Sequence, residues 1–213
     1  MQAARGTSVD HPESGPDAPR PPVRRRSWAV FAAVAAVLYT ADQWSKWAAV
    51  EHLTDRDDVR VVGDLLRLHL TRNPGAAFSL GTEFTVALSC AAILATVVVL
   101  YYSLRLRDRL WSVALGALLA GITGNLTDRL LREPGPFRGH VIDFFRLPSW
   151  PIFNVADIAI NLGAALILVQ VFRGVRLDGT RHHDDPGEDP ESADQPVDHE
   201  SKGEATGDSE ESP

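Results

Sequence analysis

Seven candidate carboxylate and amide side chains lie within long apolar stretches of this sequence or in the loops that join them. They are Asp42, Asn73, Asn125, Asp128, Asp143, Asn154 and Asp157. Charged and amide groups are costly in apolar surroundings, so each is a candidate for a functional site. Two carboxylates held close together there do not both ionise easily and tend to share a proton. One can then act as a base toward water and the other as an acid toward a carbonyl oxygen, which is aspartyl peptide hydrolysis.

Other hydrolytic chemistries fit these residues less well. The sequence has no His-Glu-x-x-His spacing for zinc, and between its polar ends the only histidines are His52, His69 and His140. Ser45 and Lys46 are adjacent, so a helix would point them to different faces. We therefore expect no metal and no cofactor, with the amides supplying donors that orient the carboxylates and stabilise an oxyanion.

Four apolar segments must position these residues. They cover 27–50, 84–104, 110–131 and 153–172, and each meets the roughly 20 residues that a helix needs to cross a bilayer. The first follows three arginines and could be read as a cleaved secretory signal, but three further spans favour a transmembrane helix. The segments predict one membrane domain over 27–176.

Both ends of the chain differ from this domain. Residues 1–26 are rich in Pro, Arg and Gly, and residues 177–213 carry thirteen acids against two bases. Such segments have too few large apolar residues to fold, so we expect a disordered N-terminal segment and a disordered acidic tail.

Positive charges predict the orientation. Arginine clusters precede the first span, fill the connection between the second and third, and follow the fourth, at 24–26, 105–109 and 173–176. With four spans all three clusters fall on one side, which places both termini in the cytoplasm. The carboxylates and amides then gather at the outer membrane face.

The first outer loop has the pattern of short strands. Residues 59–62 and 65–71 flank Gly63 and Asp64, and leucines alternate with polar residues in the second run, as in a half-buried strand. We therefore predict an all-α membrane protein with four transmembrane helices and a small extracytoplasmic β-sheet in this loop.

Three local patterns concern the helices themselves. Asp42 and Lys46 are four residues apart and can pair on one helical face, either as part of a site or as a structural ion pair. Asp128 adjoins Arg129, so loss of its charge should mainly disturb that arginine. Small residues form one face of the third helix and predict close helix packing, at Gly116, Ala120, Gly121 and Gly124.

Five motifs together resemble the signature blocks of the lipoprotein signal peptidase (signal peptidase II) family, in family order. They are Asp-Gln-Trp-Ser-Lys at 42–46, Asn-Pro-Gly-Ala-Ala-Phe at 73–78, Gly-Asn-Leu-Thr-Asp-Arg at 124–129, His-Val-Ile-Asp-Phe at 140–144 and Phe-Asn-Val-Ala-Asp at 153–157. The resemblance covers about residues 28–173, while the long polar ends fall outside the family pattern.

The resemblance implies a multi-pass enzyme of the bacterial plasma membrane. It would remove signal peptides from prolipoproteins, cutting before a cysteine that carries diacylglycerol, and its catalytic pair would be Asp143 and Asp157. Substrate-binding or supporting roles would fall to Asp42, Lys46, Asn73, Gly75, Asn125, Asp128, Arg129 and Asn154. Its partners would be prolipoproteins and membrane lipids, with no nucleic acid, and it would act as a monomer.

Residue chemistry alone leaves alternatives open. Asp128 is a rival to Asp143 as the partner of Asp157, because both lie at the predicted outer face. A channel or transport subunit would need polar residues at several membrane depths, whereas the inner halves of the second and fourth spans are almost wholly apolar. A structural assembly factor with a buried polar network is a third reading.

Overall fold

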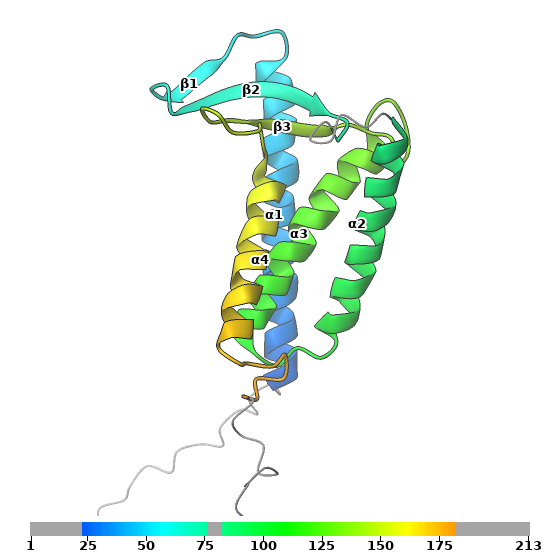
Figure 1. Cartoon of the computed structure of the whole chain (residues 1–213), viewed down its shortest axis with the longest axis vertical. Coiled ribbons are helices and arrows are strands. Elements are labelled where there is room, and N and C mark those ends of the chain that lie inside the picture. The colour runs from blue at the N-terminus through cyan, green and yellow to red at the C-terminus, as the bar shows by residue number, and fades with distance from the viewer. Residues whose placement is uncertain (1–22, 76–81, 182–213) are drawn as a thin grey trace, which may run out of the picture. The chain divides into compact units, whose positions relative to one another are not determined.

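Four long helices and a small sheet make up the fold in a computed structural model, which describes residues 23–75 and 82–181 (Figure 1). The helices are α1 (Val23–Leu53), α2 (Thr82–Ser103), α3 (Arg109–Leu131) and α4 (Val155–Phe172). α3 packs against the other three helices, most extensively against α4 and α1. Side chains on α3 are therefore placed to join residues from several elements.

Three of these helices are long and apolar enough to cross a membrane. They are the Phe84–Ser103 part of α2, and α3 and α4 over their full lengths. α1 is the longest helix, but its second half carries Asp42, Gln43 and Lys46. Those polar residues lower its hydropathy and set it apart from the other three.

A three-stranded antiparallel sheet lies at one end of the helices (Figure 1). Its order is β1 (Val59–Val62), β2 (Leu66–Asn73) and β3 (Val141–Arg146). The sequence predicted the first two strands, although β2 extends two residues further. It did not predict β3, because the first four residues of that strand are all buried and show no alternation of polar and apolar side chains.

The close packing predicted for α3 is present. A methyl group on Gly116 would lie 2.8 Å from the carbonyl oxygen of Phe31 in α1, which is too close. One on Gly121 would meet the carbonyl oxygen of Ala156 in α4. Small residues at these positions let the backbones of three helices approach.

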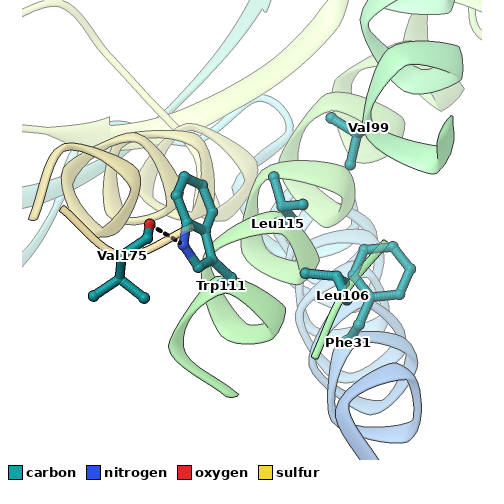
Figure 2. Packing of buried hydrophobic residues seen from close by; sticks show 6 residues of the cluster. All are labelled: Phe31, Val99, Leu106, Trp111, Leu115 and Val175. Carbon is teal, nitrogen blue, oxygen red and sulfur yellow. Dashed lines mark hydrogen bonds between the residues drawn. The ribbon is translucent and has the colours of Figure 1, made fainter. Parts of the chain in front are cut away.

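An apolar core fills the other end of the helices (Figure 2). The cluster comprises Phe31, Val99, Leu106, Trp111, Leu115 and Val175. The indole nitrogen of Trp111 donates a 2.9 Å hydrogen bond to the carbonyl oxygen of Val175, which follows α4. The backbone N–H groups of Arg107 and Asp108 donate to the carbonyl oxygen of Leu177, at 3.0 and 3.4 Å.

Ordered structure extends past the ends of the predicted apolar segments. Leu177 packs against the apolar core, so the ordered contacts of the domain continue past 176. α1 begins at Val23, four residues before the predicted span. The remaining parts predicted to be disordered, 1–22 and 182–213, lie outside the described residues, as does 76–78 of the second motif.

Candidate active site

Asp143 and Asp157 are brought together by one residue, Asn154. The side-chain amide of Asn154 donates to Asp143 Oδ1 at 2.6 Å. Its backbone N–H donates to Asp157 Oδ2 at 3.0 Å, and its Oδ1 accepts from the backbone N–H of Asp157 at 3.0 Å. These last two bonds form the capping box that starts α4. The helix start thus holds a carboxylate from β3 and one from α4 on a single asparagine, the first through its side chain and the second through its backbone.

Asn125 of α3 adds a second amide to this pair. Its Nδ2 donates to Asp157 Oδ1 at 2.9 Å, while its Oδ1 accepts from Asn154 Nδ2 at 3.1 Å and from Lys46 Nζ at 2.9 Å. The lysine fixes which end of the Asn125 amide is the acceptor, because an ammonium can only donate. Asp157 therefore receives its donor from Asn125 in a defined orientation.

Asn73, the last residue of β2, closes the arrangement from the sheet. Its Nδ2 donates to Asp143 Oδ2 at 2.9 Å, and its Oδ1 accepts from the backbone N–H of Gly75 at 2.8 Å. Gly75 has a φ of 109°, which side-chain-bearing residues rarely adopt. Thr85 of α2 donates to the carbonyl oxygen of Pro74 at 2.5 Å and so holds this turn in place.

A buried ion cluster lies beside the pair formed by Asp143 and Asp157. Lys46 is fully buried, and its Nζ lies 2.9 Å from both Asp42 Oδ2 and Asp128 Oδ2. Asp42 Oδ1 also accepts from the backbone N–H of Ala156 at 2.8 Å, in the first turn of α4. The pairing of Asp42 with Lys46 predicted from the sequence is confirmed, and it joins α1 to both α3 and α4.

Asp128 has different partners from those predicted. Besides Lys46 it accepts from Arg132 Nε at 2.5 Å and from the backbone N–H of Ile142 at 3.2 Å. No hydrogen bond or ion pair joins it to Arg129 within the described part of the chain. Residues one apart on a helix point in different directions, whereas Arg132 is four residues on and lies on the same face as Asp128. The charge of Asp128 still acts on Arg129 at longer range.

Arg129 is instead a cation with a spare donor. Its Nε is buried and is the one such side-chain nitrogen or oxygen without a hydrogen-bond partner among residues 23–75 and 82–181. The charges of Asp143, Asp128 and Asp157 act on it. A buried donor left unpaired is costly, so an acceptor on a bound molecule would stabilise this site.

Burial sets the protonation of Asp143, whose side chain belongs to β3 and is only 2% exposed. Loss of solvation raises the pKa of Asp143 from 3.8 to about 6, and the charge of Asp157 adds to this, while hydrogen bonds from Asn73 and Asn154 oppose it. Asp143 can therefore hold a proton at mildly acidic pH while most aspartates are ionised.

Asp157 opens onto a groove of about 320 Å³. The groove is lined by Trp150, Phe153, Asp157, Ile158, Asn161 and Leu162. Its walls are mainly apolar, and Ile158 and Leu162 are about half exposed on α4. One carboxylate of the pair is thus buried, and the other faces a space that an apolar chain can enter.

The predicted site residues therefore meet in one place, at the sheet end of the helices. Sequence reasoning missed Arg132 and Thr85, which hold Asp128 and the turn at Asn73. The spacing of four between Asp128 and Arg132 could have revealed the first. Across the described ranges, no group of three or more His, Cys, Asp or Glu side chains is placed to hold a metal ion.

Comparisons with known proteins agree with the motifs. Residues 34–173 match the family model described as signal peptidase (SPase) II. The lipoprotein signal peptidase of Leifsonia xyli subsp. xyli is 42% identical over 176 residues, which cover 78% of this chain and 82% of the relative. That of Streptomyces coelicolor is 39% identical over 189 residues, which cover 85% and 93%.

Solved structures show the same fold. A bacterial membrane enzyme structure determined by the in meso method at 1.9 Å superposes with a TM-score of 0.62 and 24% identity, covering 68% of this chain and 94% of that one. A second such structure gives a TM-score of 0.59 and 25% identity. The chain therefore belongs to the lipoprotein signal peptidase (signal peptidase II) family and is a membrane hydrolase of lipoprotein processing.

Proposed function

We propose that this chain is an aspartyl endopeptidase that removes signal peptides from prolipoproteins, cutting before the cysteine that carries diacylglycerol. Asp143 and Asp157 are its catalytic pair. The observation that carries the proposal is the shared contact of both carboxylates with Asn154, beside an apolar groove. The family membership supports the substrate class.

The surroundings of the two carboxylates suit different roles. Asp143 is buried and has a pKa raised to about 6, which suits the acid that protonates the scissile carbonyl oxygen. Asp157 accepts from Asn125 and from the Asn154 backbone, and it lines the groove, where water and substrate can reach it. Asp157 is therefore the base that takes a proton from the attacking water.

The reaction then follows from these positions. Water attacks the carbonyl carbon of the residue before the cysteine, Asp157 takes its proton, and Asp143 protonates the carbonyl oxygen. Collapse of the tetrahedral intermediate breaks the C–N bond: the proton held by Asp157 passes to the amine of the cysteine, and the hydroxyl formed from the carbonyl oxygen returns its proton to Asp143 as the new carboxyl group forms. The unpartnered Arg129 Nε is available to a substrate carbonyl, and the amides of Asn73 and Asn125 keep the carboxylates aligned.

The environment of Asp128 argues against it as the catalytic partner of Asp157. It is fully buried and is held by Lys46 and Arg132. These contacts with two cations leave it engaged with structural groups. Asp128, Asp42 and Lys46 therefore act as supports that join α1 to the end of α3 and the start of α4.

The membrane placement completes the proposal. α1 also crosses the membrane, in addition to α2, α3 and α4, so the chain has four spans and both termini are cytoplasmic. The sheet and the carboxylate pair then lie at the outer face of the bacterial plasma membrane. The groove beside Asp157 then receives the apolar signal segment or acyl chains of the substrate. The enzyme works as a monomer among membrane lipids, without a cofactor. A transport path is disfavoured because the buried charged residues of the described ranges, Asp42, Lys46, Asp128 and Asp143, all belong to this one site.

The direct test uses purified full-length protein and a prolipoprotein prepared with and without diacylglycerol on its cysteine. We expect a shorter product that begins at the cysteine, and only from the modified substrate. Equal cleavage of the unmodified form would reject the lipid requirement, and absence of any product from either form would reject the proposed activity.

A further inference from the structure

A second cavity, of about 560 Å³, lies where α3 ends against the sheet. It is lined by Arg72, Leu131, Arg132, Glu133, His140 and Ile142. None of the catalytic pair contributes to its lining, and the mechanism above does not use it.

The strand register places this cavity on the opposite face of the sheet from the catalytic pair. Arg72 of β2 is paired with Ile142 of β3, so the two share one face. Asn73 and Asp143 are the next residues along each strand and point to the other face, where they are hydrogen-bonded to each other. A ligand in the cavity would therefore be separated from the catalytic carboxylates by the β2–β3 ladder.

The cavity is built to receive an anion. The Arg72 guanidinium makes no hydrogen bond or ion pair with the described residues. The Nε of Arg132 donates a hydrogen bond to Asp128, which fixes the position of the side chain. The two terminal nitrogens of Arg132 have no hydrogen-bond partner among the described residues. Two guanidinium groups outnumber the single carboxylate, Glu133. Planar guanidinium groups bind phosphate through paired hydrogen bonds.

The place of the cavity, at the end of a helix that can span the membrane, indicates the source of the anion. Leu131 is the last residue of a helix that can span the membrane, and it is 80% exposed at the mouth of the cavity. Arginine and lysine pockets beside membrane helices can bind the anionic headgroups of lipids, as is known for pockets on the cytoplasmic side, and the same charge complementarity applies at this helix end. We propose that this cavity binds the phosphate of a membrane phospholipid, held by Arg72 and Arg132, with the acyl chains lying against Leu131 and α3. Diacylglyceryl-cysteine carries no phosphate, so this lipid is distinct from the substrate.

Binding is measured on the purified full-length protein in detergent, by native mass spectrometry, with phosphatidylglycerol as the probe. The comparisons are diacylglycerol with the same acyl chains and inorganic phosphate alone. Arg72→Gln should weaken phosphatidylglycerol binding about tenfold, the usual effect of losing one charged hydrogen-bonding partner. Arg60→Gln is the matched control, because Arg60 is an exposed arginine of the same sheet outside the cavity.

Three results would overturn the proposal. Equal weakening by both substitutions would indicate general charge attraction, and equal binding of diacylglycerol would indicate that the acyl chains alone are recognised. Inorganic phosphate binding as tightly as phosphatidylglycerol would identify the free ion as the ligand. If Arg72→Gln lowers the melting temperature, phosphatidylglycerol binding is measured on Arg72→Lys instead. Lysine keeps the positive charge but lacks the planar guanidinium that binds phosphate through paired hydrogen bonds. Unaltered lipid binding in that variant would contradict the proposal.

Discussion

Asn154 donates a 2.6 Å hydrogen bond from its side-chain amide to Asp143 Oδ1, although the two residues belong to different elements. The same asparagine is the N-cap of α4 and completes a capping box with Asp157. Formation of the helix start and alignment of the two carboxylates are therefore one structural event. This coupling gives a way to separate stability from catalysis at a single position.

Substitution of Asn154 should do so. Asn154→Ala removes both the cap and the donor, and it should cost about 1 kcal/mol of stability along with most of the activity. Asn154→Ser keeps a capping oxygen but has no amide that can reach Asp143. We expect this variant to recover part of the melting temperature lost by the alanine variant, while single-turnover cleavage stays at least about tenfold slower than in the unmodified enzyme. Normal cleavage by Asn154→Ser would show that the amide does not position Asp143.

Lys46→Met tests the buried ion cluster. Loss of the ammonium leaves Asp42 and Asp128 close together and without their shared cation, at a site that water does not reach. The free energy of unfolding should fall by about 3–5 kcal/mol. Arg60→Gln breaks an exposed pair and should change it by less than about 1 kcal/mol. Unfolding in mild detergent, followed by helical signal, compares the two, and an unchanged midpoint for Lys46→Met would contradict the supporting role.

The raised pKa of Asp143 predicts a pH-dependent stability. As pH rises, the unfolded chain loses this proton near 3.8, before the folded protein loses it near 6. The stabilisation is therefore fully present below about 3.8 and is lost as the pH passes through about 6, by about 3 kcal/mol in all. The difference in unfolding free energy between the unmodified protein and Asp143→Asn should shift by this amount over that range. If this difference in unfolding free energy stays constant as the pH rises, or changes in favour of the unmodified protein, Asp143 does not hold a proton in the folded protein at mildly acidic pH.

Truncation at two points tests where the domain ends. Removal of residues 182–213 should leave melting temperature and activity unchanged. Removal of everything after Arg176 should lower the melting temperature by several degrees, because the carbonyl oxygen of Leu177 accepts from Arg107 and Asp108 and its side chain packs on the apolar core. The predicted boundary at 177 came from composition, which changes gradually there. Equal stability of the two truncated proteins would remove the structural role of Leu177.

Sequence reasoning located the helices well because long apolar runs have few alternative structures. The predicted segment 110–131 differs from α3 by one residue at its start. The fourth predicted segment starts two residues before α4. It included the apolar Phe153, whereas the helix begins only after its N-cap, Asn154. β3 was missed because a fully buried strand lacks the alternation that identifies strands.

The sequence predicted which residues belong to the candidate site, but not which of them contact one another. Topology brings the second half of α1, the end of α3 and the start of α4 together, so the gathering of carboxylates and amides followed from the order of the spans. The choice between Asp128 and Asp143 did not, because it depends on which carboxylate the cations reach. Only the folded chain places Lys46 and Arg132 on Asp128 and leaves Asp143 to the amides.

Single-turnover cleavage by Asp143→Asn, Asp157→Asn and the double variant tests the central claim most directly. The substrate is diacylglyceryl-modified prolipoprotein, and Asp128→Asn is the control for loss of a buried carboxylate outside the pair. If the two aspartates share one proton, each single variant should be inactive at near-normal melting temperature, and the double variant should be little worse than either. Asp128→Asn should lose stability before it loses the chemical step. Near-normal turnover by Asp143→Asn, beside an inactive but fully stable Asp128→Asn, would show that Asp128 and not Asp143 is the partner of Asp157.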